Sequence, residues 1–513
     1  MADVFTKAFD WKEARVARVA GYYPFFKAIG ENSGTEVVID GKKTIMVGAN
    51  SYLSLSTHPS VKAAAMEAVR RFGASCCGSR FANGTFEIHE ELERRLARFL
   101  RKESALCFTT GFTTNLGTIS ALLGRHDAAV VDRGNHASLM DGVQLTFADT
   151  IKYKHNDMAD LEKKLALADK EQGKLLITDG VFSMEGDLAD LPGIVALKKK
   201  YGFRIMVDDA HGLGVMGEGG RGTGEHYGLH DDVDLIMGTF SKSFGSVGGV
   251  IAGQRDVIDW VKHRARTMIF AASMSPPTVA AALAALDIIE AEPERRQRLW
   301  QIADRMRTSL TGMGFDTGVS CTPIIPILVG EQMKTFDLWK SLLEAGVFTN
   351  AVIPPAVEPG RSMLRTSYQA AHTEEQLDAV LDAFETIGKK LKLIQRARPA
   401  TAQRITVQLQ RPTEEIPLPS LPASLPSRPA PTRSLLRLPS LPGPLRDRLD
   451  AAWSLTGLPT MDLDRLQRQG QATIEKVRDA VEAVTYRAAG LDPSTLTQLP
   501  KKLLSRVRRN GRN

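Results

Sequence analysis

An alternation of short β-branched runs with amphipathic segments, extending from residue 60 to about residue 300, constrains the fold more than any other feature of this chain. The runs are continuously apolar, as in strands that are covered on both faces of a sheet. The clearest of them occupy residues 128–132, 174–178, 204–208 and 234–238. Segments with apolar residues at helical spacing separate these runs. The order predicts an α/β domain with a large, mostly parallel sheet and helices on both faces.

Changes in composition divide the 513 residues into segments, and the length suffices for two or three domains. Eleven of the 25 prolines lie between Pro399 and Pro444, which indicates an extended linker. We predict five segments. They are an N-terminal segment that packs with the small domain (1–59), a large ligand-binding domain (60–300), a small α+β domain (301–395), a Pro-rich linker (396–446) and a basic helical tail (447–513).

Charge is distributed unevenly along the chain. From Arg396 onward there are 20 Lys/Arg against 10 Asp/Glu, and since the whole chain carries +7, the preceding residues carry −3. A negatively charged partner would therefore meet the tail. An amphipathic helix with a polybasic end favours anionic lipid head groups or an acyl carrier protein, while a solvated extension is the alternative. Aromatic residues do not interleave with the basic ones, so no nucleic acid is expected.

Cysteine content and hydropathy favour a cytoplasmic protein. Four cysteines do not make a disulfide framework, which agrees with a reducing compartment. No apolar stretch follows a basic start, so no secretory signal is expected. The most apolar stretch, residues 276–289, is too short to span a bilayer and contains Asp287. Peripheral contact with the inner membrane surface through the tail stays open.

The candidate site begins with a carboxylate and a lysine that each follow a predicted strand. Asp208 ends the run 204–208, and the carboxyl ends of parallel strands face the crevice where α/β sheets bind ligands. Lys242 lies among small and hydroxylated residues, of which Thr239 and Ser241 can donate hydrogen bonds to a phosphate. Taken singly, the aspartate could equally cap a helix, and a Ser-Lys pair is common.

Two further elements precede the aspartate. Residues 109–114, Thr-Thr-Gly-Phe-Thr-Thr, make a turn into a predicted helix, and Gly111 and Phe112 lie within it. Backbone N–H groups and the helix dipole favour an anion there, although a plain turn with a helix cap is the alternative. His136 lies in a loop after another strand, where a histidine by itself would be a satisfied loop residue.

Pyridoxal 5'-phosphate (PLP) chemistry accounts for these elements together. Lys242 would form the Schiff base with the cofactor. The carboxylate of Asp208 would keep the pyridine nitrogen protonated, which makes the ring an electron sink. The imidazole of His136 would stack on the ring and that of His211 would bond the phenolic oxygen, while the turn and the hydroxyls hold the phosphate. No Cys/His spacing indicates a metal site.

Residues 20–390 resemble the α-oxoamine synthase family of fold-type I PLP enzymes. Eight stretches match the family's motifs. They are Gly-Ser-Arg-Phe-Ala-Asn-Gly-Thr (78–85), Thr-Gly-Phe (110–112), Asn-His-Ala-Ser (135–138), Asp-Gly-Val-Phe-Ser-Met-Glu-Gly-Asp (179–187), Val-Asp-Asp-Ala-His (207–211), Gly-Gly-Arg-Gly (219–222), Gly-Thr-Phe-Ser-Lys-Ser (238–243) and Met-Leu-Arg-Thr-Ser (363–367). The resemblance implies an aminotransferase-like fold, a PLP-dependent acyltransferase activity and a homodimer.

The resemblance also implies roles beyond cofactor binding. Lys242 would move protons at the substrate α-carbon, and Ser183 would lie near the edge of the cofactor ring. Arg365 would receive the substrate carboxylate, because a guanidinium offers a bidentate fork. Asn50 is a second candidate for that carboxylate, and His136 would help to orient it.

Within the family, Thr-Phe-Ser-Lys-Ser at 239–243 with Val-Gly-Gly at 247–249 resembles the serine palmitoyltransferase branch. That branch implies a decarboxylating Claisen condensation of L-serine with a long-chain acyl thioester, which yields 3-ketodihydrosphingosine for sphingolipid synthesis. The sequence leaves open the acyl chain length and the choice between coenzyme A and acyl carrier protein as donor. The residues alone also leave open whether the amino-acid substrate is serine, glycine or alanine.

Two alternatives and two departures accompany this interpretation. Another synthase, such as 2-amino-3-ketobutyrate CoA ligase or 8-amino-7-oxononanoate synthase, would use glycine or alanine with a different acyl-CoA. A non-catalytic partner subunit is more remote, because such a subunit would be expected to lose Lys242. The family often has Asn-Tyr-Leu-Gly where residues 51–54 are Ser-Tyr-Leu-Ser. It also usually has Ser or Thr at Ala271 or Ala272, where the partner subunit reaches the phosphate.

Overall fold

The structure of the protein is a computed structural model that describes residues 3–394. The predicted linker and tail at 396–513 lie outside the described residues. The chain divides into two units, and the first contains helices α1 (Thr6–Asp10) and α2 (Glu13–Val19). The second unit begins at Tyr22 and contains every other described helix and strand.

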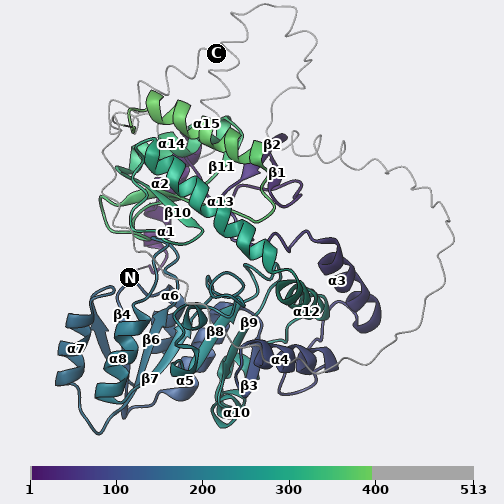
Figure 1. The fold of residues 1–513 in the computed structure, drawn as a ribbon, viewed down its shortest axis with the longest axis vertical. Coiled ribbons are helices and arrows are strands. Elements are labelled where there is room, and N and C mark those ends of the chain that lie inside the picture. Colours follow the sequence, from purple (N-terminus) through teal and green to yellow (C-terminus); the bar gives the residue numbers. More distant parts are fainter. Residues whose placement is uncertain (1–2, 395–513) are drawn as a thin grey trace, which may run out of the picture. The chain divides into compact units, whose positions relative to one another are not determined.

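A seven-stranded sheet is the largest element of the second unit (Figure 1). Its order is β3-β9-β8-β7-β6-β4-β5, and only β9 runs antiparallel to its neighbours. The strands are β3 (Ser104–Phe108), β4 (Asp127–Asp132), β5 (Asp149–Tyr153), β6 (Gly173–Asp179), β7 (Arg204–Asp208), β8 (Leu235–Thr239) and β9 (Gly249–Gly253). The predicted mostly parallel sheet is confirmed, and the predicted runs coincide with four of its strands.

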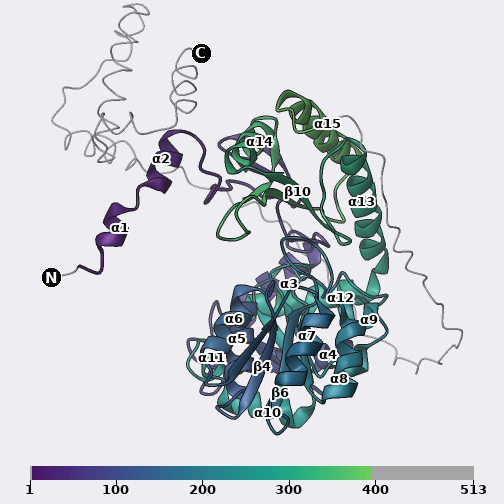
Figure 2. The same cartoon turned by 90° about the vertical axis from the view of Figure 1, so that its left-hand side faces the viewer.

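Helices cover both faces of this sheet because successive strand residues enter two different apolar clusters. In β4, Ala129 and Val131 pack in one cluster and Val130 packs in the other. The first cluster includes residues of α5 (Gly111–Leu122), α6 (Ala137–Gln144) and α10 (Arg255–Arg264). The second includes residues of α4 (Glu87–Phe99), α7 (Met158–Leu167), α8 (Leu191–Tyr201) and α12 (Pro276–Ala291), as Figure 2 shows for α7 and α8. Helix α3 (Pro59–Phe72) packs on α12, and the short helices α9 (Thr223–His226), η1 (His230–Asp232) and α11 (Arg266–Ile269) join longer elements.

Two three-stranded sheets form a smaller lobe with its own core. One sheet contains β1 (Glu36–Ile39), β2 (Lys42–Met46) and β11 (Val347–Phe348), and the other contains β10 (Ile324–Gly330), β13 (Ser362–Ser367) and β12 (Asn350–Val352). Helices α13 (Pro293–Gly312), α14 (Gln332–Glu344) and α15 (Glu374–Lys390) pack around Trp339 and Phe384. Three strands, β11, β12 and β13, lie between the last two helices, and the first two of them are only two and three residues long.

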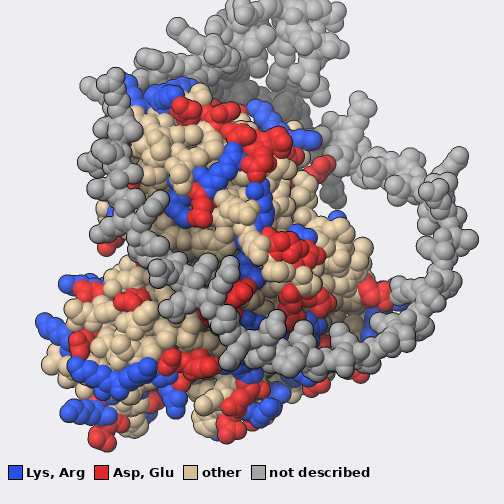
Figure 3. Space-filling view, in the orientation of Figure 1, with Lys and Arg blue, Asp and Glu red and all other residues tan. Residues whose placement is uncertain are grey.

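Basic and acidic side chains are interspersed on the face of the described residues that Figure 3 draws. Among the described residues, no helix combines the length and the apolar character that crossing a bilayer would need.

Candidate active site

Polar residues end four neighbouring strands of the large sheet at the same edge. Asp132, Asp179, Asp208 and Thr239 are the last residues of β4, β6, β7 and β8. Because parallel strands bring their carboxyl ends together, three of these residues line one cavity of about 300 Å³; Asp132 does not. Eight residues predicted from the sequence also line it: Gly111, Phe112, His136, Asp208, His211, Thr239, Ser241 and Lys242.

Lys242 follows β8 in a tight turn and faces this cavity. Burial lowers the pKa of its amine to about 8, because the charged form loses its hydration. The carboxylate of Asp208 opposes this shift, and the guanidinium of Arg365 adds to it. About one amine in ten is therefore neutral at pH 7, far more than for an ordinary lysine, and the neutral form is the one that acts as a nucleophile or proton acceptor.

Asp208 is held by donors on both of its oxygens. Asn115 donates its Nδ2 proton to Oδ2 at 2.7 Å, and the backbone N–H of Ala210 donates to Oδ1 at 2.9 Å. The aspartate is 3% exposed and Asn115 is 1% exposed. Asn115 was not predicted, because an asparagine one turn into a helix carries no distinctive sequence pattern. Its position after the Gly-containing turn was the signal that could have found it.

His136 begins helix α6 as its N-cap residue and lines the cavity. Its backbone N–H donates to Oδ2 of Asp179 at 2.7 Å, and its Nδ1 lies 2.8 Å from Oγ of Ser138. Burial lowers the pKa of this imidazole, with Asp208 acting in the opposite direction. A neutral ring suits stacking on a cofactor face better than a desolvated cation does.

His211 lies in the segment that follows β7, and its ring is bonded to a tyrosine. Tyr52 Oη lies 2.7 Å from Nδ1 of His211, and both residues are buried. Burial places the pKa of this imidazole well below its usual value. Tyr52 lies in the motif at 51–54 and was not predicted to reach the site. Asp179 was also missed, although it ends a strand in the same way as Asp208.

The beginning of α5 and the turn after β8 line the part of the cavity where the sequence predicts that a phosphate binds. Thr110 caps α5 and accepts a hydrogen bond from the N–H of Thr113, so the helix starts at Gly111. A Cβ atom added to Gly249 would lie 2.8 Å from Cα of Gly111, so only glycine permits this close approach. Unpaired helix N–H groups and two hydroxyls together suit a phosphate.

Arg365, Ser183 and Asn50 were also predicted from the sequence, and they are not among the residues that line the cavity. Arg365 lies on β13 and is 5% exposed, and its Nε donates to the carbonyl oxygen of Ser183 at 2.6 Å. Its Nη2 lies 3.5 Å from Oη of Tyr52, which links it to His211. Asn50 has a buried Oδ1 with no hydrogen-bond partner among the described residues.

These side chains fit PLP on their own chemistry. A buried lysine with a lowered pKa, a carboxylate fixed by two donors and a helix start with two hydroxyls match an aldehyde, a pyridine nitrogen and a phosphate. The cavity of about 300 Å³ lies at the lower end of the range for small-ligand sites. Among the described residues, no cluster of His, Cys, Asp or Glu could hold a metal ion.

Comparison with known proteins agrees with this chemistry. Residues 42–384 match the family described as aminotransferase class I and II. A serine palmitoyltransferase of Bacteroides thetaiotaomicron is 49% identical over 374 residues, which are 73% of this chain and 95% of the relative. An 8-amino-7-oxononanoate synthase of Thermoanaerobacter pseudethanolicus is 43% identical over 395 residues, 77% of this chain and 100% of the relative. A structure described as SPT with PLP internal aldimine superposes with a TM-score of 0.75 at 37% identity, covering 77% of this chain and all of that one.

The fold and the site together define a PLP-dependent transferase with the aminotransferase-like fold of fold type I. Within that class, the chain belongs to the α-oxoamine synthase family, close to the bacterial serine palmitoyltransferases. The family resemblance predicted from the sequence is therefore confirmed, as is the cofactor.

Proposed function

We propose that this protein condenses L-serine with a long-chain acyl-CoA such as palmitoyl-CoA, with loss of carbon dioxide, to give 3-ketodihydrosphingosine. The observation that carries the proposal is the 47–49% identity to four proteins named serine palmitoyltransferase, over 92–95% of their length. The cavity around Lys242 supplies the side chains that such a reaction needs. The presence of Lys242 also argues against a non-catalytic partner subunit.

When bound, PLP would supply an aldehyde that links to the substrate amine and a protonated ring that stabilises negative charge at the α-carbon. Asp208, fixed by Asn115, would keep the ring nitrogen protonated. His136 would cover one face of the ring and exclude water from it. Gly111 and the hydroxyls of Thr239 and Ser241 would hold the phosphate.

The remaining steps would depend on a lysine and an arginine. Lys242, with a pKa near 8, would accept the proton from the substrate α-carbon and later return it. Arg365 would bind the substrate carboxylate, because its two Nη atoms make only long hydrogen bonds of 3.4 and 3.5 Å to other residues that the structure describes. Ser183 would assist by holding the guanidinium through its carbonyl oxygen. Asn50 would be a second donor to that carboxylate through the N–H groups of its side-chain amide.

An 8-amino-7-oxononanoate synthase activity is the second candidate, because proteins with that name are 40–43% identical over 91–100% of their length. The two candidates differ in amino acid and in acyl chain, and both would use the residues named above. A spectral titration of the PLP-loaded protein with serine, glycine and alanine separates them. It is followed by addition of palmitoyl-CoA and mass analysis of the product.

A change in the cofactor spectrum with serine alone, and a long-chain 3-keto amino alcohol as product, would support the proposal. Selection of alanine or glycine, or reaction with short acyl chains only, would replace it by another synthase activity. Lys242→Ala is the matched control, since it should take up PLP without forming the product.

For the assembly we propose a cytoplasmic homodimer whose basic C-terminal region contacts anionic lipid head groups or an acyl carrier protein. The support is the family resemblance and the surplus of 20 Lys/Arg over 10 Asp/Glu from Arg396 onward. Sedimentation tests the dimer. Flotation with phosphatidylserine-containing vesicles, comparing the full chain with a chain ending at Ile394, tests the lipid contact. Equal flotation of both chains would remove the tail from the proposal.

A further inference from the structure

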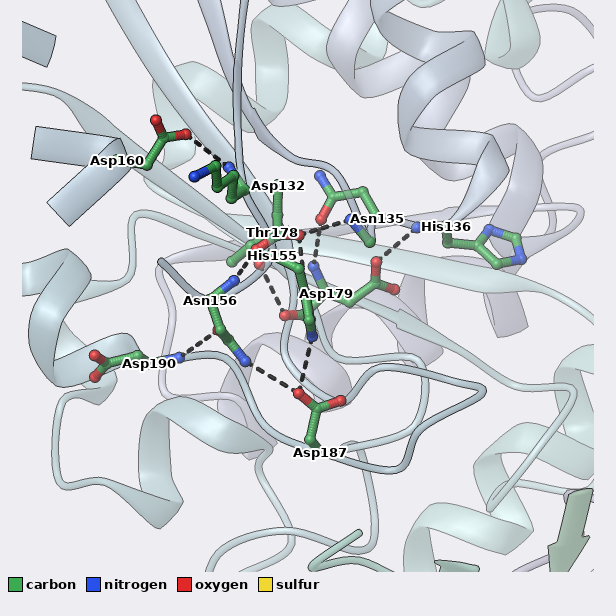
Figure 4. Close-up of polar contacts among 12 residues, drawn as sticks. Asp132, Asn135, His136, His155, Asn156, Asp160, Thr178, Asp179, Asp187 and Asp190 are labelled. Carbon is green, nitrogen blue, oxygen red and sulfur yellow. Dashed lines mark hydrogen bonds and ion pairs between the residues drawn. The ribbon is translucent and has the colours of Figure 1, made fainter. Parts of the chain in front are cut away.

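His155, which does not line the cavity, bridges Asp132 at the end of β4 and Asp187 in the loop that follows β6. It follows β5, and its Nδ1 lies 3.0 Å from Oδ1 of Asp132 while its Nε2 lies 3.0 Å from Oδ2 of Asp187 (Figure 4). The side chain of Asp132 is fully buried and that of Asp187 is 14% exposed. The imidazole ring of His155 also makes a T-shaped contact with the ring of Phe182, with the ring centroids 4.3 Å apart and the ring planes at 85°.

The two bonds hold the imidazole in its charged form. Hydrogen bonds to Asp132 and Asp187 raise the pKa of His155 to about 10, against the effect of burial. A neutral imidazole has only one N–H, so it could donate to one aspartate and not to both. The bridge therefore consists of one cation between two anions, a charge-assisted arrangement that is stronger than neutral hydrogen bonds.

On one side, the bridge fixes the loop that carries His136. Asp132 accepts a further bond from the N–H of Gly134 at 2.7 Å. A Cβ atom on Gly134 would lie 2.7 Å from Nδ1 of His155, so the loop is packed directly against the imidazole. Only one residue separates Gly134 from His136, which Asp179 holds by its backbone N–H.

On the other side, the bridge fixes the turn that carries Ser183. The carbonyl oxygen of Asp187 accepts the N–H of Phe182 at 2.9 Å, so these two residues close the turn around Ser183. The carbonyl oxygen of Ser183 in turn accepts the Nε proton of Arg365. Asn156, next to His155, adds a bond from its Nδ2 to Asp187 at 3.1 Å and from its N–H to Asp132 at 2.8 Å.

We propose that His155 is a positioning residue, which sets the distance and angle between the ring-covering His136 and the carboxylate-binding Arg365. This inference rests on the proposed function of those two residues. His155 touches neither substrate nor cofactor in this arrangement, and acts through the two turns that it joins. Displacements of about 1 Å at reacting groups are enough to cost on the order of 100-fold in rate.

The test compares His155→Gln with a matched control, His230→Gln. Glutamine has one NH₂ end and no charge, so it cannot bridge both aspartates. His230 is the first residue of η1, is bonded through Nε2 to the carbonyl oxygen of Leu100 at 2.6 Å, and does not line the cavity either. Four quantities are measured for each protein: the unfolding midpoint without PLP, the Kd for PLP, the pH midpoint of the absorption change of bound PLP, and kcat and KM for serine.

For His155→Gln we expect a shifted spectral midpoint, a serine KM raised about 10-fold and kcat lowered at least about 10-fold. His230→Gln should lower the unfolding midpoint and leave the other three quantities within about 2-fold. If His155→Gln changes only the unfolding midpoint, the histidine is structural and the inference is wrong. Should His155→Gln fail to fold, Asp187→Asn replaces it, since the amide removes one charge and retains an acceptor.

The outcome separates this inference from the proposed function. The Kd for PLP and the spectral midpoint do not require the condensation reaction. If the wild-type protein binds PLP and does not condense serine with palmitoyl-CoA, the proposed function fails while the spectral midpoint still decides the role of His155. If His155→Gln and Asp187→Asn each give normal spectral and kinetic values, the inference about His155 is wrong, and the proposed function is unaffected.

Discussion

The lowered pKa of Lys242 predicts how the PLP-free protein takes up its cofactor at different pH values. With a pKa of about 8, roughly one amine in ten is neutral at pH 7, compared with about one in 2,500 for an ordinary lysine of pKa about 10.4. Only the neutral amine attacks the aldehyde. The uptake rate should therefore rise about 10-fold between pH 7 and pH 9 and then level off.

Stopped-flow absorbance after mixing PLP with the PLP-free protein measures this rate between pH 6 and pH 10. The ionisations of free PLP are the same in every mixture, so a comparison of variants isolates the lysine. Arg365→Gln removes a positive charge that lowers the pKa of Lys242, and the rate profile should move to higher pH. Asp208→Asn removes a negative charge that raises this pKa, and the profile should move to lower pH.

A wild-type rate that climbs about 100-fold between pH 7 and pH 9 without levelling off would show an ordinary lysine and would refute the reasoning. Movement of both variants in the same direction would also refute it, because the two charges act with opposite sign. Lys242→Ala, which lacks the amine, should lose the covalent phase at every pH.

Three further predictions concern packing and buried polar groups. Gly249→Ala should weaken PLP binding at least about 10-fold, measured by equilibrium titration, because the new methyl displaces Gly111 at the start of α5. Glu93→Gln should lower the free energy of unfolding in urea by about 3–5 kcal/mol, since it leaves the charge of the nearly buried Arg80 uncompensated; a change below about 1 kcal/mol would contradict this. Tyr52→Phe should cost about 1–3 kcal/mol in the same assay of the PLP-free protein, because the buried imidazole that it bonds loses a partner.

The parts of the fold that the sequence predicted are those with strong local patterns. Strands buried on both faces require continuous apolar runs, so β4, β6, β7 and β8 were recognisable. Strand β9 contains only five residues, two of them glycine, and its antiparallel direction depends on pairing with β3 about 145 residues earlier. The two short strands β11 and β12 likewise depend on partners that no local pattern shows.

The same distinction applies to the site. Lys242, Asp208 and His136 follow strands directly, so the topology of the sheet brings them to one cavity. Asn115 lines the cavity from a helix, and Tyr52 bonds His211 from an N-terminal loop; both hydrogen bonds depend on tertiary contacts. The roles given to the predicted residues stay predictions until the variants above are measured.

The pairing of β3 with β9 has a consequence for biosynthesis. Strand β3, which leads into α5, pairs with β9 at residues 249–253. The start of α5 and Lys242 therefore cannot come together until the ribosome has synthesised about half of the chain. The small lobe closes later still, since β2 pairs with β11 at residues 347–348. Bacterial and eukaryotic ribosomes add about 5–20 residues per second, so an incomplete nascent chain exists for several seconds with apolar strand edges open. Cofactor capture is thus a late event, and the nascent large domain is the form that chaperones would meet.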